Sequence, residues 1–455
     1  MLQDPQLADP TPPVPPQNTN RPSERGIAQT VVTSLLVVLA FGAGWFGNAY
    51  VNQANYIPAD DVNQHIINQA YTEITKNYVF TNAIDKQKMA YAAINAMVDT
   101  LGDTGHSRFE TPEEYKNEAS QLNNDKIIGI GVYLGGGGDK PLIITAIMPN
   151  SPAAKANLKA GDQITAVNGT TLKGLTIEQA SPLIKGDGKE GSSVTLTIVT
   201  PTAKPPTPRD VTLVRAEITP PTAVGYTISD LNIAHIQLLD FSANADDELK
   251  KAIRDAQSKN VKGIILDLRG NGGGYLDQAV NVTSEFVAPG PDKNVMILKT
   301  RTTSETLKVK SGGIATTTPL VILVDGNTAS AAEITAGAIA INRPDVQTVG
   351  EKTFGTGTVL EPKTLADGST LILGTGEWLL PDGKSVYHNG YEPQNVVALP
   401  KDVVAYTPLT GNGDLTTLAD IKAANDTQLL KAIALMQAKT GGATTTPTAT
   451  ATPTP

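Results

Sequence analysis

The chain has 455 residues, a formal net charge of −9 with only four histidines, and no cysteine. This length predicts about three domains at roughly 150 residues each, and the acidic balance excludes the clustered Lys and Arg of a nucleic-acid-binding surface. The lack of cysteine excludes disulfides, thiolate nucleophiles and Cys-based zinc sites, so covalent catalysis would need another residue.

The N-terminal part is predicted to be a membrane anchor behind a disordered start. Residues 1–25 are rich in Pro, Gln and Asn and cannot bury a core, whereas 26–51 carry no charge and are long enough to span a bilayer. Arg21 and Arg25 precede this segment and no Lys or Arg follows before Lys76, which predicts a single pass with the N-terminus inside and the rest extracytoplasmic. A cleaved signal peptide is the alternative, but the apolar run is longer than a typical h-region and lacks a clear cleavage site.

Residues 58–124 are predicted to form a helical arm, because their apolar residues recur with a period close to 3.6. Thr111 followed by Pro112 is typical of a helix start. We expect the arm to act as a cap or as a contact in a homo-oligomer. His106 is a lone histidine with no second ligand at a helical spacing, so the sequence does not favour a metal or catalytic role for it.

Residues 125–200 change to short β runs with two helices between them. The motifs Gly129-Ile130-Gly131-Val132, Ser151-Pro152-Ala153 and Val167-Asn168-Gly169 resemble those of a PDZ domain. The resemblance implies that the four residues of the first motif hold a peptide's terminal carboxylate, while the peptide adds a strand to the sheet edge. The alternative is a PDZ fold that only braces its neighbour.

Residues 210–400 read as an α/β core that contains a glycine-rich turn. A short apolar strand runs directly into Asp267-Leu268-Arg269-Gly270-Asn271-Gly272-Gly273-Gly274. Such glycines let backbone N–H groups converge on one point. A Walker phosphate loop ends in Lys followed by Ser or Thr, whereas this turn ends in Gly-Tyr-Leu, so phosphate binding is disfavoured.

A second strand, 319–325, leads through Gly326-Asn327 into a helix beginning near Ala329. This arrangement lifts the Ser330 hydroxyl above the sheet at a helix N-terminus, where developing negative charge is favoured. The pattern is typical of a nucleophile, although a helix-capping serine is the plain alternative.

The order of these segments, followed by Thr353-Phe354-Gly355-Thr356-Gly357, resembles that of the carboxyl-terminal processing proteases. The resemblance implies a multidomain α/β protein with a helical arm, a PDZ domain and a split, crotonase-like ββα protease core. It also implies hydrolysis of proteins near their C-termini without metal or other cofactor, with Ser330 as nucleophile and the N–H groups of Gly273 and Ala331 as oxyanion donors. Residues 401–440 resemble the family's C-terminal helical segment, and 441–455 are predicted to be disordered.

The general base is the open point of this resemblance. The family uses a lysine where this chain has Thr356, and Leu360 replaces a supporting glutamine. A threonine hydroxyl is too weakly basic to accept a proton near pH 7. Glu333 and Lys352 are the candidate alternative bases, and His388 lies on a separate loop. Two functions therefore stay open, a membrane-anchored serine endopeptidase and a catalytically impaired scaffold that binds C-terminal tails, with a purely structural envelope protein as a third.

Overall fold

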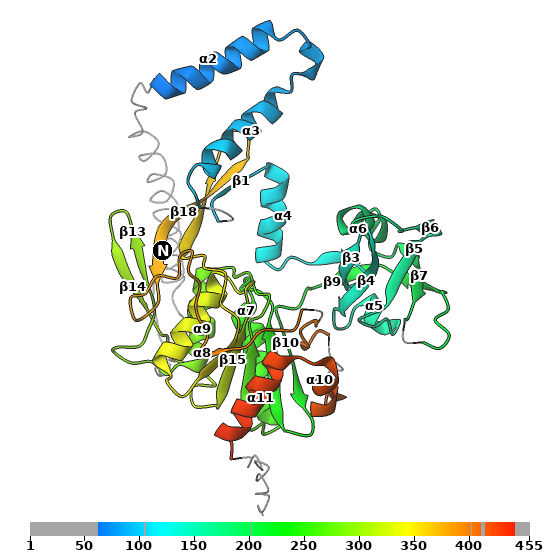
Figure 1. Ribbon diagram of the computed structural model, residues 1–455, viewed down its shortest axis with the longest axis vertical. Helices are drawn as coiled ribbons and strands as arrows, with labels where there is room; N and C mark the ends of the chain where they lie inside the picture. The colour runs from blue at the N-terminus through cyan, green and yellow to red at the C-terminus, as the bar shows by residue number, and fades with distance from the viewer. Residues whose placement is uncertain (1–61, 104–105, 202, 402, 411–414, 442–455) are drawn as a thin grey trace, which may run out of the picture. The chain divides into compact units, whose positions relative to one another are not determined.

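The computed structural model describes residues 62–103, 106–201, 203–401, 403–410 and 415–441 (Figure 1). The chain divides into two compact units, residues 1–89 and 90–455. The predicted segments 1–25 and 26–51, and the tail from 442 onward, lie outside the described residues. Among the helices that the structure describes, none has the length and apolar character needed to cross a membrane.

The first unit contains helix α2 (Val62–Asn77) and the short 3₁₀ turn η1 (Thr81–Ala83). The apolar period predicted for the arm places Ile66, Ile67 and Ile74 on α2, and these side chains are 45% to 55% exposed. The apolar face of α2 is therefore not buried by the described part of this chain.

Helix α3 (Lys86–Asp99), strand β1 (Arg108–Glu110) and helix α4 (Pro112–Leu122) follow. Helix α4 begins where the sequence predicts, because Thr111 Oγ1 accepts from Glu114 N and the Glu114 carboxylate accepts from Thr111 N, a capping box. Strand β1 pairs antiparallel with β18 (Thr370–Leu379). This pairing ties the segment that precedes β1 to the α/β core.

A small β domain follows the arm. Its edge strand β3 pairs with β4 only among the described strands, which leaves one edge of β3 open. Helices α5 (Pro152–Lys155) and α6 (Ile177–Lys185) complete the domain, and β2 (Ile127–Gly129) pairs with β9 (Ala216–Ile218) beside it. The strands, in pairing order, are β3 (Val132–Gly137), β4 (Lys140–Ile147), β5 (Gln163–Val167), β7 (Ser193–Val199) and β8 (Arg209–Val214), with β6 (Thr170–Thr171) on β5.

The α/β core is built on a mostly parallel sheet. Only its first strand pair is antiparallel, and the other pairs are parallel. In pairing order the six strands are β10 (Ala223–Ile228), β11 (Ile233–Leu238), β12 (Ile264–Asp267), β15 (Leu320–Val324), β16 (Gln347–Gly350) and β19 (Asn395–Val396).

Helices cover both faces of this sheet (Figure 1). Ile264 and Leu266 point to the face that packs on α7 (Ala245–Ser258), α8 (Leu276–Phe286) and α9 (Ala331–Asn342). Ile265, between them, points to the opposite face, which packs on α11 (Thr427–Lys439). Because both faces are buried, the strands read as continuous apolar runs. Helix α10 (Leu418–Ala424) precedes α11.

A second sheet has five strands in the described part of the chain. Strand β18 is its centre, and pairs with β1, with β13 (Asn294–Thr300) and with β17 (Thr358–Thr364), while β14 (Ser304–Lys308) pairs with β13. The segment 351–357 between β16 and β17 forms a loop.

A buried ionic cluster ties the C-terminal helix to the glycine-rich turn. The Arg269 guanidinium donates to Asp267 at 2.8 and 2.9 Å and to Asp426, the N-cap of α11, at 2.9 and 3.1 Å. Burial acts to raise the pKa of Asp267, but Arg269 and His235 outweigh it and hold that pKa well below its usual range. The cluster fixes the start of the turn between β12 and α8.

Candidate active site

Asn271 organises the glycine-rich turn from inside. Its side-chain amide donates to Leu238 O at 2.8 Å, its side-chain oxygen accepts from Gly273 N at 2.9 Å, and its carbonyl accepts from Ala329 N at 2.9 Å. The turn between β12 and α8 is thus bonded directly to the turn between β15 and α9. The fold brings these two motifs together, as their resemblance to a protease core implies.

Gly273 lies against the residue predicted as nucleophile. Its φ is +99°, and a Cβ at this position would lie 2.7 Å from Ser330 Cβ and 3.0 Å from Ala331 N. Only glycine allows this approach. In the structure the Gly273 N–H points to Asn271, whereas Ala331 is the first residue of α9, where helical N–H groups have no partner in a preceding turn.

Gly273→Ala should lower kcat on an unstructured peptide at least about 10²-fold, because the new methyl group would displace Ser330 and the backbone at Ala331, where the oxyanion is expected. The matched control is Gly272→Ala, since a Cβ there would meet no atom within 4 Å. Equal activity of the two variants would show that close approach at 273 is not needed.

Ser330 has a strained backbone at the N-cap of α9. Its φ of 53° and ψ of −120° are rare for a residue with a side chain, and such conformations cost about 1–3 kcal/mol. The strain is stabilised by two acceptors for the Ser330 N–H, Glu333 Oε2 at 2.9 Å and Thr356 Oγ1 at 3.2 Å. The half-buried serine therefore has a fixed backbone next to the cavity described below.

Glu333 acts as an acceptor that fixes the loop 351–357. Besides Ser330 N, its fully buried carboxylate accepts from Thr353 Oγ1 at 2.5 Å, Gly355 N at 2.8 Å and Thr356 N at 3.0 Å. Four donated hydrogen bonds occupy the two oxygens, so the geometry gives this carboxylate a structural task. The sequence predicted Glu333 only as a candidate base, from its helical spacing.

Thr356, where the resemblance leads us to expect the family's lysine, lies directly beside Ser330. Thr356 is buried, and its hydroxyl accepts from the Ser330 N–H, while Leu360 is half-buried in the wall of the same cavity. Lys352 is exposed, and its side chain passes Gly390 and is not among the residues that line this cavity. Among the described residues, no hydrogen bond joins Ser330 Oγ to an amine, imidazole or carboxylate.

Ser330, Gly273, Ala331 and Thr356 line one cavity of about 790 Å³. The wall also contains His106, which the sequence did not favour as a site residue. His106 Nδ1 lies 3.0 Å from Asp103 Oδ1, and its ring is 3% exposed. Pairing of β1 with β18 brings this segment to the cavity, and no local pattern predicts that pairing. The sequence signal that could have indicated a role for His106 is Asp103, an acidic residue three positions before it.

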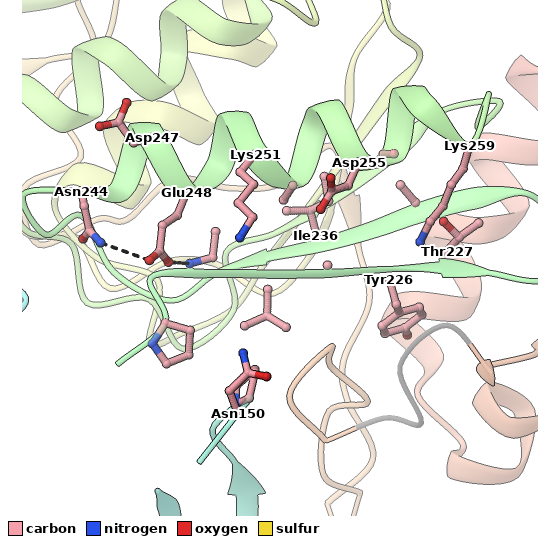
Figure 2. A pocket seen from close by; sticks show the side chains of 18 of the residues that line it. Asn150, Tyr226, Thr227, Ile236, Asn244, Asp247, Glu248, Lys251, Asp255 and Lys259 are labelled. Carbon is pink, nitrogen blue, oxygen red and sulfur yellow. Dashed lines mark hydrogen bonds between the residues drawn. The ribbon is translucent and has the colours of Figure 1, made fainter. Parts of the chain in front are cut away.

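A second hollow, of about 610 Å³, lies along β10 and α7 and shares no lining residue with the Ser330 cavity (Figure 2). Glu248 on α7 projects into it and accepts from Thr222 N, Ala223 N and Asn244 Nδ2. These bonds hold the start of β10 on α7, so the role of Glu248 here is structural.

The predicted carboxylate-binding motif lies between β2 and β3. Ile130 is buried in the core of the small β domain, and its carbonyl accepts from Ala153 N at 2.9 Å. Gly131 has φ +77°, and a Cβ there would lie 2.2 Å from Ser151 Cβ. Gly129 ends β2 and Val132 begins the open-edged strand β3. The loop is thus fixed at the end of the edge to which a peptide strand would add.

Comparisons with known proteins match both parts of this arrangement. The model described as "Peptidase family S41" matches residues 232–397, and the model described as "PDZ domain" matches residues 120–199. The carboxy-terminal processing protease CtpA of Bacillus subtilis (strain 168) is 35% identical over 334 residues, 73% of this chain and 69% of that protein. The chain belongs to peptidase family S41, the family of the carboxy-terminal processing proteases. The resemblance found in the sequence is confirmed.

Other members of the S41 family agree. The carboxy-terminal processing protease CtpB of Bacillus subtilis (strain 168) is 30% identical over 336 residues, 73% of this chain and 68% of that protein. The crystal structure of a putative S41 protease from Bacteroides fragilis NCTC 9343 superposes with a TM-score of 0.54 at 21% identity, over 82% of this chain and 97% of that one. The predicted fold, a mixed α/β protein with a PDZ domain and an S41 protease core, is confirmed.

Proposed function

We propose that this S41 protein is a serine endopeptidase that cleaves proteins near their C-termini, with Ser330 as nucleophile. The observation that carries the proposal is the contact between the two catalytic turns. Gly273 packs against Ser330 and Ala331, and the strained Ser330 backbone is held by Glu333 and Thr356. Residues so constrained cluster at functional sites, where the constraint is part of preorganisation.

The chemistry proposed for this site is acyl transfer. Ser330 Oγ attacks the scissile carbonyl carbon, and the negative charge that develops on the carbonyl oxygen is stabilised by Ala331 N–H at the start of α9. Gly273 N–H is the second donor, which requires that its bond to Asn271 be exchanged for the oxyanion. Each such donor is worth roughly 10²–10³ in kcat.

The PDZ domain is proposed to select the substrate. The terminal carboxylate would bind at Gly129, Ile130, Gly131 and Val132, and the peptide would add to the open edge of β3. Selection by a carboxylate explains why cleavage would occur near C-termini.

The membrane-anchored, extracytoplasmic location belongs to the proposal and rests on the uncharged segment 26–51 and the arginines before it. A homo-oligomer through the arm is supported by the exposed apolar side chains Ile66, Ile67 and Ile74 of α2.

A second candidate function is a scaffold that binds C-terminal tails without cleaving them. The observation that favours it is Thr356 at the position of the family's lysine, with no alternative base hydrogen-bonded to Ser330 Oγ among the described residues. The two functions share the peptide site and differ only in whether a base activates Ser330.

Hydrolysis of an unstructured protein with a free C-terminus tests the proposal. The full chain should shorten it by cuts near that end, seen as new masses. Intact substrate at high enzyme concentration, together with retained binding, would favour the scaffold.

Amidation of the substrate's C-terminus should weaken binding to the full chain more than about tenfold, or about 1.4 kcal/mol, because the amide removes the charge that the backbone N–H groups are proposed to hold. Fluorescence anisotropy with matched acid and amide peptides measures the difference. Equal affinities would remove carboxylate capture from the proposal.

A further inference from the structure

We infer that His106, oriented by Asp103, is the general base that takes the proton from Ser330 in place of the family's lysine. This inference rests on the proposed protease function and adds the residue that the function lacks. It makes His106 a catalytic residue and Asp103 a positioning residue.

The first observation is the unpartnered nitrogen of His106. His106 is 3% exposed, and its side chain lies in the wall of the Ser330 cavity. Its Nε2 atom has no hydrogen-bond partner among the described residues. Thr358 Oγ1 and Trp378 Nε1 are likewise buried without a partner and belong to residues that line this cavity. Buried polar atoms of native proteins have partners, so the cavity is built to receive hydrogen-bonding groups.

The second observation fixes the proton on the other nitrogen. Burial acts to raise the pKa of Asp103, but hydrogen bonds from Ser107 and Tyr387, together with His106, hold that pKa below its usual range. An ionised carboxylate only accepts hydrogen bonds. Nδ1 of His106 therefore carries the ring proton and donates it to Asp103 Oδ1, which lies 3.0 Å away. The lone pair of a neutral His106 is therefore on Nε2.

The pair is fixed to the core and not only to its own loop. Ser107 Oγ accepts from Gly374 N on β18 at 2.9 Å, and Tyr387 Oη donates to Asp103 Oδ1 at 3.1 Å. Both contacts reach across more than 200 residues of sequence, one to strand β18 and the other to the turn that contains Tyr387, so the core holds the Asp103–His106 pair in place.

The other buried histidine shows what a structural pair looks like in this protein. His235 is fully buried between β10 and β12, and both of its nitrogens are satisfied, Nδ1 by Tyr226 Oη and Nε2 by Asp267, each at 2.9 Å. It does not line the Ser330 cavity. Like His235, His106 has a carboxylate partner on one ring nitrogen, but its second nitrogen has no partner among the described residues.

Phe354 lies against the imidazole in the wall of the same cavity. Its ring centroid lies 5.5 Å from that of His106, and its side chain is 51% exposed between Thr353 and Gly355. Catalytic hydrogen bonds are often long in free enzymes and shorten when substrate binds, or are bridged by one water. We expect His106 Nε2 to reach Ser330 Oγ across this shared cavity, directly or through such a water, when substrate is bound.

The reaction balances with these groups alone. His106 Nε2 accepts the Oγ proton as Oγ bonds to the carbonyl carbon, and the resulting imidazolium, stabilised by Asp103, gives that proton to the leaving nitrogen as the C–N bond breaks. Water then attacks the acyl ester, His106 takes a proton from it, and this proton returns to Ser330 Oγ as the shortened chain leaves with its new carboxylate.

His106→Asn in the full chain should lower kcat about 10²–10⁴-fold with little change in KM, because the general base acts only in the transition state. Asp103→Asn should lower kcat similarly, since its amide can donate to Nδ1 and so move the imidazole proton to Nε2. The matched control is His388→Asn, which removes the ring that stacks on His106 at 6.2 Å and should stay within about threefold of wild type. Thermal melting of each variant verifies that it is folded.

The pH dependence of kcat/KM distinguishes a general base from a residue that only supports the structure. Wild-type kcat/KM should fall in one step as the pH is lowered, because a protonated imidazole cannot accept the Ser330 proton, and this step should be absent from the residual activity of His106→Asn. The charged or titratable groups that face His106 are Asp103, Tyr387, His388 and Arg108, which donates to its carbonyl. His388→Asn must keep the step if His106 causes it.

The outcomes separate this inference from the proposed function. A wild-type chain that cleaves nothing overturns the proposed function itself. A wild-type chain that cleaves, with folded His106→Asn and Asp103→Asn variants of unchanged kcat, overturns the inference and leaves Ser330 in its role. Loss of the pH step in His388→Asn alone would assign the base to that histidine instead.

Discussion

Ser330→Ala should abolish hydrolysis, with a loss of roughly 10⁴–10⁶ in kcat, because it removes the attacking oxygen at the junction of the two catalytic turns. A serine-directed phosphonate should label the wild-type chain once, at Ser330, and should not label the alanine variant. Intact-mass measurement reports the label, and peptide binding should be unchanged.

The control for the nucleophile is Ser258→Ala, which removes an exposed hydroxyl in the last turn of α7. This variant should be labelled and active like wild type. Full labelling of the Ser330→Ala chain would place the nucleophile elsewhere. Labelling of wild type without any hydrolysis would mean that the serine is reactive and that a later step fails.

A lysine placed at 356 should restore activity to a chain that has lost its base. In the His106→Asn chain, Thr356→Lys together with Leu360→Gln should raise kcat by roughly 10²–10⁴, the usual contribution of a positioned base. Thr356 Oγ1 lies 3.2 Å from Ser330 N, so an amine on a longer side chain can reach the hydroxyl through the cavity. Burial there lowers the pKa of the amine and keeps it neutral.

The matched control is Thr356→Met with Leu360→Gln in the same His106→Asn chain, which adds similar length without an amine. Initial rates on one unstructured peptide compare the two triple variants. Equal rates in the lysine and methionine chains, with phosphonate labelling retained in both, would show that a proton acceptor is not what the site lacks.

The sequence predicted the parts of the site that depend on local order. Ser330 and Gly273 each lie in a strand, turn and helix unit, and such units are recognisable because their glycines and small residues are close in sequence. The two turns meet because β12 and β15 are adjacent parallel strands, whose carboxyl ends share one edge of the sheet.

The parts that the sequence could not predict depend on long-range pairing. Glu333 was considered as a base from its spacing, yet three of its four hydrogen-bond donors come from the loop 351–357, about 20 residues further along. His106 enters the cavity because Arg108 pairs with Ile372, a register that no periodicity encodes. The sequence alone therefore does not predict that His106 lies in the cavity.

The buried cluster of Arg269, Asp267 and Asp426 makes the glycine-rich turn depend on a residue that is synthesised much later. The ribosome makes Ser330 about a hundred residues before Asp426, whose carboxylate is one of the two that neutralise Arg269 in its 4% exposed position. A nascent chain that lacks α11 would have to bury this guanidinium with half of its counter-charge, which disfavours the closed turn. The turn that carries Gly273 is therefore expected to close only after α11 has docked.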